Sequence, residues 1–393
     1  MDLRLSPDEL RFRDELREWL RATLPRLDPR PDDGDYGGRR AWEAAWQRLL
    51  YDAGYAGIHW PEEFGGRGAT PFEHLIYLEE AQRLGAPEHA CTFVGLLHAG
   101  PTLILEATPE QKAAHLDPIL RGDHIWCQGF SEPNAGSDLA ALATRAIRDG
   151  DDYVVSGQKI WTSFGQVADY CELLVRTDGD APKHRGISWL ICPMDLPGID
   201  VRPIRTAAGT REFCEVFLDE VRIPVANRVG PENDGWRVAM VTFSFERGTG
   251  FVGSLMAANR ELAALADLAR HVTRRRATAW DDAAIRREIG HLQAELDALW
   301  ALTKRNVSQA ARTGIVGPGG SVFKLYYADV LRRTSELAQR ILGRMAIAHL
   351  DDIDPLDLGG RRLRALTLGI AAGTSQIQRN IVGERVLGLP KER

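Results

Sequence analysis

The sequence predicts a mostly helical α+β fold in three parts, with an antiparallel sheet in the middle of the chain. In the first and last thirds, apolar residues recur at helical spacing, whereas the middle consists of short β-branched and aromatic runs between turn signals. Strands follow strands without intervening helices, which argues against a doubly wound parallel sheet. We therefore expect an N-terminal helical domain at 1–121, a β domain at 122–230 and a four-helix-bundle-like domain at 231–393.

The first third contains helix start signals followed by amphipathic segments. Ser6 and Pro7 form a cap and first-turn proline, and Phe12, Leu16 and Leu20 then fall on one helical face. A segment rich in Pro, Asp and Gly predicts a loop at 27–40. Further helices are expected at 42–51, 72–84, 91–106 and 109–120.

The middle third contains turn dipeptides at regular intervals, among them Asp149-Gly150 and Ser156-Gly157, which indicate hairpins. The region closes at Val221–Pro224 and Gly230. The expected strands are 125–130, 143–147, 153–156, 160–162, 171–176, 187–193 and 213–218.

The last third is again helical, and long bundles of this kind often pack against copies of themselves. A last helical pair is interrupted at Gly373-Thr374. The helices are expected at 235–274, 281–313, 321–345 and 361–387, with a polar loop at 351–360.

Composition excludes several function classes. The chain has 393 residues, a net charge of -6 and a pI near 6.0, which argues against nucleic acid as a partner. The N-terminus is too charged for a signal peptide and no apolar run approaches membrane-spanning length, so we expect a cytoplasmic protein without a membrane contact. Five scattered cysteines without a CxxC pair fit free thiols.

The ten histidines lack metal-ligand spacing, so no metal site is expected. His59, His74, His98 and His291 are interpreted as packing or surface residues. There is no G-x-S-x-G elbow, which leaves a serine hydrolase without support. The G-x-G-x-x-G match at 248–253 lies in a helical third rather than after a strand, so close helix packing explains it better than nucleotide binding.

The most informative stretch is WCQGFSEPNAGSD, residues 126–138. Ser131, Gly136 and Ser137 bring small side chains, hydroxyls and backbone N–H groups to one place, which suits contact with a planar polar ring. An ordinary strand-to-turn junction is the alternative.

Glu246 and Arg247 lie in the sequence FSFERG. A carboxylate flanked by aromatic residues is partly desolvated, which makes it a better proton acceptor. A solvated ion pair on a helix is the alternative, and the residues alone leave both interpretations open. At Gly373–Gln376, small polar residues before a helix could present free N–H groups to a phosphate or ring carbonyl, or could simply be adjoining helix caps.

Four segments together resemble the acyl-CoA dehydrogenase family over nearly the whole chain. They are Phe130–Asp138, Gly157–Ser163, Val221–Pro224, and Ala372–Asn380 followed by Leu387–Pro390. The resemblance implies the family's fold, FAD as cofactor, an acyl-CoA substrate and an electron-transfer flavoprotein as acceptor. It also implies a tetramer, or a dimer, of like or unlike subunits.

The resemblance implies a role for each cofactor-binding segment. The flavin ring would lie between two groups of side chains, which are Gln128, Phe130 and Ser131 on one side, and Trp161 and Ser163 on the other. Gly136 and Ser137 would contact the cofactor or the acyl thioester. The remaining FAD contacts would come from Thr374 and Gln376 at the phosphates or ribose, and from Arg340 and Gly343 at the adenine of a neighbouring subunit's FAD.

The resemblance also identifies a catalytic base. Many members carry a glutamate directly before the Gly-Thr of the C-terminal motif, where this chain has Ala372. The isovaleryl- and long-chain-type members place it on the helix after the sheet, directly before an arginine, where this chain has Glu246. Glu246 would then remove the α-proton as the β-hydrogen leaves as hydride. Arg247 would position the CoA end of the substrate or orient Glu246.

Several positions depart from the commoner pattern. Gln128 replaces a tyrosine, Phe164 an asparagine and Gly343-Arg344 a double glycine, and 346–360 replaces a Gly-rich stretch. This layout resembles bacterial steroid side-chain dehydrogenases that pair unlike subunits. Three alternatives to the dehydrogenase of an acyl-CoA therefore stay open. These are a partner subunit without turnover of its own, a carrier-protein thioester dehydrogenase and, more distantly, a flavin monooxygenase.

Overall fold

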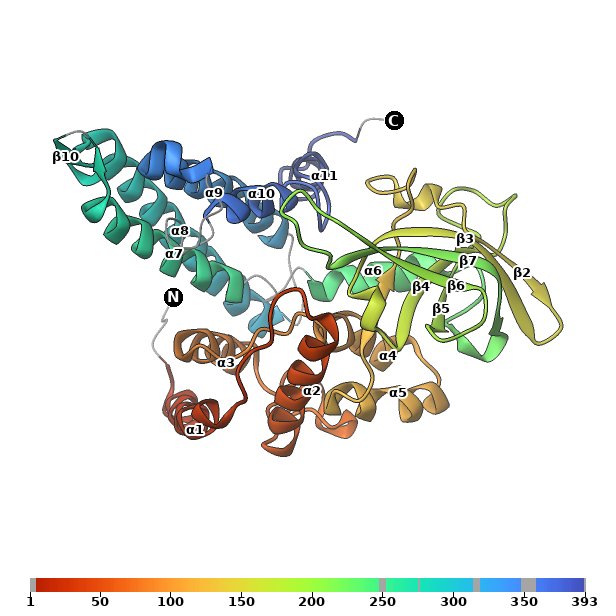
Figure 1. Ribbon diagram of the computed structural model, residues 1–393. Helices are drawn as coiled ribbons and strands as arrows, with labels where there is room; N and C mark the ends of the chain where they lie inside the picture. The colour runs from red at the N-terminus through yellow and green to blue at the C-terminus, as the bar shows by residue number, and fades with distance from the viewer. Residues whose placement is uncertain (1–4, 247–251, 275, 314–318, 348–357, 392–393) are drawn as a thin grey trace.

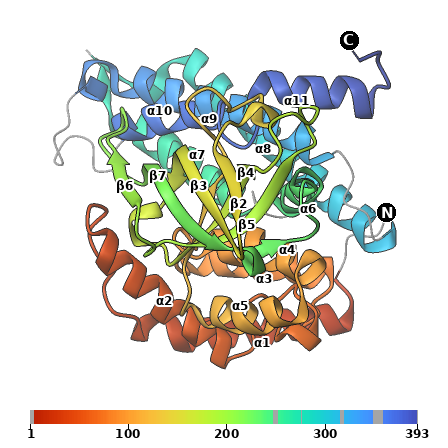
Figure 2. The same cartoon turned by 90° about the vertical axis from the view of Figure 1, so that its right-hand side faces the viewer.

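The computed structural model describes residues 5–246, 252–274, 276–313, 319–347 and 358–391. In Figure 1 its N-terminal helices lie at the bottom, the sheet at the right and the C-terminal helices at the upper left. The N-terminal helices cover one side of the central sheet, and the C-terminal helices lie on the opposite side of the view in Figure 2. The expected succession of helices, sheet and helices is confirmed.

The first part contains five α-helices in the described residues: α1 (Pro7–Thr23), α2 (Tyr36–Asp52), α3 (Pro71–Leu84), α4 (Gly100–Glu106) and α5 (Pro109–Arg121). A π-helical turn, Gly95–Ala99, leads into α4. Ser6 and Glu9 form a reciprocal capping box at the start of α1, as the sequence predicted. The loop expected at 27–40 was too long, because Asp35 accepts a hydrogen bond from the Gly38 N–H and starts α2 within it.

The strands of the middle part are β1 (Trp126–Gly129), β2 (Arg145–Asp149), β3 (Asp152–Ser163), β4 (Tyr170–Arg176), β5 (Ile187–Pro193), β6 (Ile199–Ile204), β7 (Phe213–Pro224) and β8 (Arg228–Val229). They form one sheet in the order β6-β7-β3-β2-β4-β5-β8, and β1 pairs with β4. The hairpin expected at Asp149-Gly150 joins β2 to β3. The two strands expected at 153–156 and 160–162 are parts of β3, whose pairing with β7 shifts register twice.

The sheet is mixed rather than purely antiparallel. β1 runs parallel to β4, with Trp126 opposite Tyr170, and β2 also meets β4 in parallel through Arg145 and Arg176. These pairings join segments far apart in sequence, which turn signals cannot reveal. The strand β6 was not expected, because it is short, polar on one face and carries Pro203 at a position that only an edge strand tolerates.

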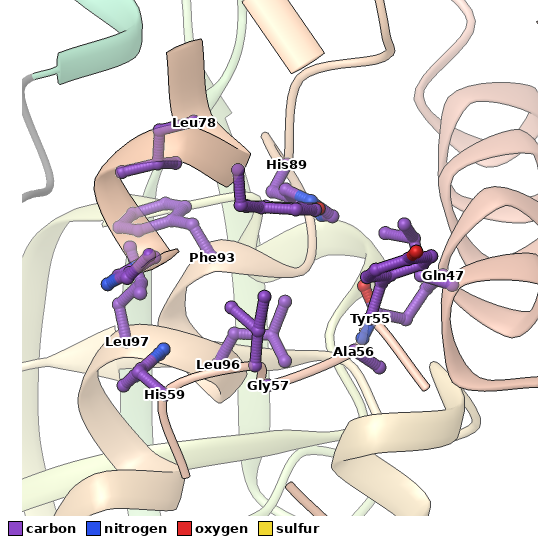
Figure 3. A pocket seen from close by; sticks show the side chains of 14 residues that line it. Gln47, Tyr55, Ala56, Gly57, His59, Leu78, His89, Phe93, Leu96 and Leu97 are labelled. Atoms are coloured by element: carbon purple, nitrogen blue, oxygen red, sulfur yellow. The ribbon is translucent and has the colours of Figure 1, made fainter. Parts of the chain in front are cut away.

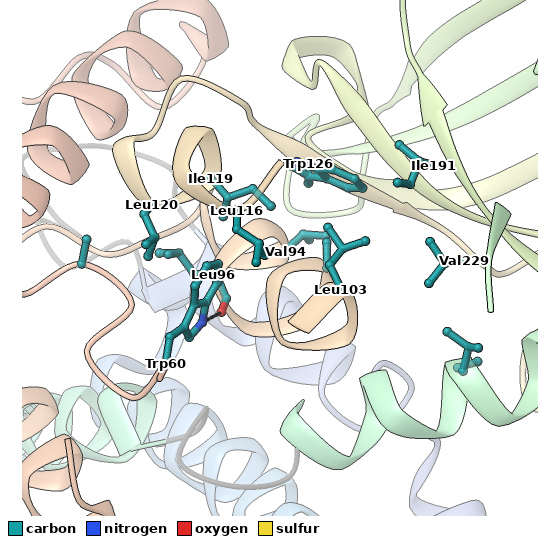
Figure 4. Packing of buried hydrophobic residues seen from close by; sticks show 14 of the residues in the cluster. Trp60, Val94, Leu96, Leu103, Leu116, Ile119, Leu120, Trp126, Ile191 and Val229 are labelled. Carbon is teal, nitrogen blue, oxygen red and sulfur yellow. Dashed lines mark hydrogen bonds between the residues drawn. The ribbon is translucent and has the colours of Figure 1, made fainter. Parts of the chain in front are cut away.

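The sheet and the N-terminal helices share one hydrophobic core (Figure 4). Trp126 of β1, Ile191 of β5 and Val229 of β8 pack in the same cluster as Leu103 of α4 and Ile119 of α5. All five side chains are almost completely buried. Close-packed interiors transmit small displacements, so we expect the helices and the sheet to behave as one body.

The helices of the last part are α6 (Gly235–Glu246), α7 (Val252–His271), α8 (Ala283–Thr313), α9 (Gly319–Leu342), α10 (Leu358–Thr367) and α11 (Ser375–Ile381). A separate core lies between α7, α8 and α9 and includes Leu262, Leu296 and Leu337. The single helix expected at 235–274 is described as two helices. Its end carries an unexpected two-stranded hairpin, β9 (Thr273–Arg274) and β10 (Ala277–Thr278). The loop expected at 351–360 lies largely outside the described residues, and α10 begins within it.

Helix α6 is fastened to the first part of the chain. Arg237 makes a two-point ion pair with Glu106 of α4, with Nη1–Oε1 and Nη2–Oε2 distances of 2.6 and 2.7 Å. The hydroxyls of Thr102 and Thr242 hydrogen-bond across the buried α4–α6 contact at 2.8 Å. At its start, Gly235 lies directly against the β5 backbone. No helix in the described ranges is both long and apolar enough to cross a membrane.

Candidate active site

A buried ion pair joins the two most distinctive motif segments. The Lys159 ammonium, fully buried on β3, donates to Glu132 Oε1 at 2.8 Å and to the Phe130 carbonyl at 3.3 Å. Glu132 also accepts the backbone N–H groups of Ala143 and Thr144, at 2.6 and 2.9 Å. Burial works against the charged carboxylate, but Lys159 and these N–H groups hold the pKa of Glu132 below its usual value. The pair therefore fixes the turn after β1 against β3.

Next to this pair, the Ile160 N–H donates to the Ser131 carbonyl at 2.9 Å, which brings Ser131 beside Trp161. Trp161 is 56% exposed and has a φ of 62°, a strained value for a residue with a bulky side chain. Its indole packs edge-on against the Phe213 ring, with 6.1 Å between the ring centroids. Ser163 lies opposite Phe213 in the β3–β7 ladder, so it belongs to the same neighbourhood.

The turn after Ser131 is open. Glu132 and Ala135 exchange backbone hydrogen bonds, which project Gly136 and Ser137 into an exposed position. A Cβ added at Gly136 would meet nothing within 4 Å. Thus the glycine supplies accessible backbone here rather than relief from a close contact.

On the other side of β1, Gln128 belongs to a polar cluster that the sequence did not predict. Its Nε2 donates to Glu172 Oε1 of β4 at 2.8 Å and lies 3.3 Å from His98 Nδ1. Glu172 is fully buried, and His98 packs edge-on against Phe93 at 5.4 Å. His98 lies in the π-helical turn before α4, a local irregularity that is frequent at functional sites. In the sequence, the available signal for this cluster was Gln128 itself, a polar residue inside an otherwise apolar strand.

Helix α6 approaches the same strand end. The ring of Phe243 packs edge-on against that of Phe130 at 5.7 Å, with an interplanar angle of 87°. Glu246, the last residue of α6, follows Phe243 by three positions in the helix. The side chain of Glu246 and all of Arg247 lie outside the described residues.

The C-terminal group lies in a different part of the chain. Thr374 caps α11 by accepting the Ile377 N–H at 3.2 Å, and Gln376 is exposed. The turn before it is held by the buried Gln378, whose Nε2 donates to the Ala372 carbonyl at 2.8 Å. Arg340 is exposed in the last turn of α9, and Gly343 ends that helix with a φ of 60°. The predicted site residues therefore form two groups, one at the β1–β3 edge and one on the C-terminal helices.

Three family models cover the chain in sequence. These are the acyl-CoA dehydrogenase N-terminal domain at residues 6–123, the middle domain at 127–221 and the C-terminal domain at 233–387. The chain belongs to the acyl-CoA dehydrogenase family. It is therefore an FAD-dependent oxidoreductase acting on a CH–CH group, and the resemblance inferred from its motifs is confirmed.

Two sequence relatives and two solved structures illustrate the family match. "Acyl-CoA dehydrogenase IpdE1" of Mycobacterium tuberculosis is 40% identical, covering 97% of this chain and 98% of that protein. "Acyl-CoA dehydrogenase FadE26" of the same organism is 34% identical, over 100% and 99%. The "Tcur3481-Tcur3483 steroid ACAD" structure matches with a TM-score of 0.83, 31% identity and full coverage of both chains. The ChsE4-ChsE5 complex of Mycobacterium tuberculosis matches with a TM-score of 0.83, 32% identity and full coverage of both.

The β1–β3 edge fits a flavin. An indole that is more than half exposed and held at a strained φ offers a flat face, and the adjoining turn offers the backbone of Gly136 and the hydroxyl of Ser137. Phe130 supplies a buried apolar floor. In the described ranges, no cluster of three metal-ligating side chains occurs.

Proposed function

We propose that this acyl-CoA dehydrogenase converts an acyl-CoA thioester to its trans-2-enoyl-CoA, with Glu246 as the base that removes the α-proton. The supporting observation is the Phe130–Phe243 contact, which sets α6 against the residue that follows β1. Glu246 lies three positions beyond Phe243 in the same helix. Ala372, the alternative position for a base, carries no group that could accept a proton.

In this mechanism the thioester carbonyl makes the α-proton acidic, and Glu246 accepts it. Bound substrate would exclude water from the carboxylate, which favours a stronger base. Ser137 contacts the thioester or cofactor, Ser131 and Ser163 orient the flavin ring, and Arg247 positions the CoA end of the substrate or orients Glu246. Bound FAD supplies the acceptor for the β-hydrogen, which leaves as hydride.

The acyl group is proposed to be bulky and ring-bearing. The supporting observation is the full-length likeness to a structure named as a steroid ACAD. We further propose that an electron-transfer flavoprotein accepts the electrons. Gln128, Thr374 and Gln376 are proposed to complete the cofactor site within the subunit, with Arg340 and Gly343 serving the FAD of a neighbouring subunit.

The first test is anaerobic mixing of the purified protein with short, long, branched and ring-bearing acyl-CoA thioesters while flavin absorbance is followed. We expect the ring-bearing thioesters to bleach the flavin fastest. Glu246→Gln should keep its flavin but lose about 10²- to 10⁴-fold in the bleaching rate. Glu110→Gln, the same chemical change at an exposed helix start, should react normally. A normal rate in Glu246→Gln would exclude this residue as the base.

A second candidate is a subunit that completes a site in an unlike partner. It is favoured by the ChsE4-ChsE5 structure, which is a complex of two different proteins. The chain purified alone would then be colourless, and flavin would be retained only after coexpression with the partner. Light scattering and the flavin-to-protein ratio, measured with and without coexpression, separate this candidate from a homotetramer. Including acyl-carrier-protein thioesters in the panel tests the remaining alternative carrier.

A further inference from the structure

Two adjoining hollows lie between α3, the segment before α4 and the start of α7. The inner hollow has a volume of about 70 Å³ and is shown in Figure 3, and the outer one has about 280 Å³. They share a wall formed by His74, Tyr77, Leu78, His89, Phe93 and Leu97. Together they fall at the lower end of the size range of small-molecule pockets, roughly 300–1,000 Å³.

Residues that line the hollows lie close to the proposed reaction centre. Phe93, in their common wall, packs on His98, and His98 contacts the flavin-side residue Gln128. On the opposite side, Gly253 and Ser254 line the outer hollow at the start of α7, the next described helix after the one that ends at Glu246. A substrate whose α-carbon lies at Glu246 would therefore direct the far end of its acyl group into the outer hollow and toward the inner one.

The inner hollow contains a stacked pair of histidines, an unusual lining for an acyl pocket. The rings of His59 and His74 are 4.7 Å apart between centroids and 13° from parallel. The Nδ1 atom of His59 is shielded from solvent and meets no hydrogen-bond partner among the described residues. Burying such an atom without a partner costs about 1–3 kcal/mol, so a ligand atom that bonds it would be strongly selected.

The charges around the hollows limit the ligand's chemistry. Among the described lining residues, none is lysine or arginine, and the charged one is Glu88. Burial lowers the pKa of His59 and of His89 to about 4, so both rings are neutral at pH 7. A neutral imidazole offers one N–H donor and one acceptor nitrogen, which suits a neutral oxygen and not a carboxylate.

We infer that the acyl group carries a ketone or hydroxyl oxygen at the end remote from the thioester, and that His59 Nδ1 hydrogen-bonds this oxygen while His74 holds the His59 ring by stacking. His59 is thus a specificity-determining residue for the dehydrogenation and takes no part in the chemistry. This inference rests on the proposed function, because it concerns the substrate of the same site.

The test uses cyclohexylpropanoyl-CoA and its ring-ketone, ring-hydroxyl and ring-carboxylate derivatives. The kcat/KM for flavin reduction is measured for each, first with the wild-type holoenzyme. We expect the ketone or the hydroxyl derivative to exceed the plain ring by about fivefold or more, the effect of one net hydrogen bond, and the carboxylate to be the poorest substrate. Equal values for all four, or a preference for the carboxylate, would overturn the inference while leaving the dehydrogenase assignment standing.

Variants localise the effect. His59→Phe should bring the ratio of oxygenated to plain substrate close to one. His59→Gln, which keeps a hydrogen-bonding amide, should retain part of the preference. His115→Phe alters a buried histidine that packs on Trp126 and Tyr170, outside the hollows, and should keep the full ratio. An unchanged ratio in His59→Phe, with normal flavin content, would overturn the inference. Failure of all four thioesters to bleach the flavin would overturn the proposed function and the inference with it.

Discussion

The buried Glu132–Lys159 pair should be the main link between the two motif segments at the flavin edge. Lys159→Met removes the ammonium and leaves Glu132 ionised in the interior, where two backbone N–H groups still donate to it. Removing one partner of a buried pair costs about 3–5 kcal/mol. At about 2.1 cal/mol/K per residue, 393 residues give an unfolding entropy of about 0.8 kcal/mol/K. We therefore expect Tm to fall by roughly 4–6 °C.

Thermal unfolding followed by circular dichroism measures this change, and flavin fluorescence reports cofactor loss in the same samples. The double variant Glu132→Gln/Lys159→Met leaves no unpaired carboxylate, so it should recover part of the loss. Lys183→Met is the matched control, because Lys183 pairs with Asp138 at the surface and should be worth less than about 1 kcal/mol. If Lys159→Met melts like the control, or if the double variant loses the sum of both single effects, the reasoning is refuted.

Three further predictions follow from local geometry. Gly235→Ala should lower the free energy of unfolding by about 1–3 kcal/mol and slow flavin reduction, because the new Cβ would lie 2.5 Å from Ser188 Cα and displace α6. An unchanged Tm together with an unchanged rate of flavin reduction would contradict this prediction. Burial lowers the pKa of His59 and His89 to about 4. As the pH falls, the unfolded chain therefore takes up protons on these rings at a higher pH than the folded protein does. Stability should fall as pH drops from about 6.5 toward 4, by up to about 3 kcal/mol for each ring, and a flat Tm over that range would oppose it. Burial raises the pKa of Cys214 to about 11, and this thiol should not react with a disulfide reagent at pH 8 until the protein unfolds, as timed labelling would show.

The sequence was sufficient where the determining interactions are local. Ser6 and Glu9 lie within one helical turn, so a capping box can be predicted from letters alone. The Asp149-Gly150 turn likewise joins strands that are adjacent in sequence. The parallel β1–β4 pairing was missed because two helical turns, two strands and their loops separate its partners. The strand β6 is difficult to predict because it is short and contains Pro203, which is tolerated in a strand only at an edge or bulge.

The candidate site shows the same division. The motifs predicted that Ser131 and Trp161 belong to one site, and the Ile160–Ser131 hydrogen bond brings them together. The buried contacts of Gln128 with His98 and Glu172 could not be predicted, because they come from three elements that meet only in the folded chain. His59 was interpreted as a packing or surface residue for the same reason, since its stacking partner lies on α3.

The attachment of α6 allows the position of the proposed base and the shape of the proposed acyl pocket to change independently during evolution. The helix that ends at Glu246 is tied to α4 by the Arg237–Glu106 ion pair and the Thr102–Thr242 hydrogen bond. Gly253 and Ser254, at the start of α7, line the outer hollow, so substitutions there can reshape the proposed acyl pocket without touching the contacts that hold α6 on α4. Descendants of this scaffold could thereby acquire new substrates while retaining one chemistry.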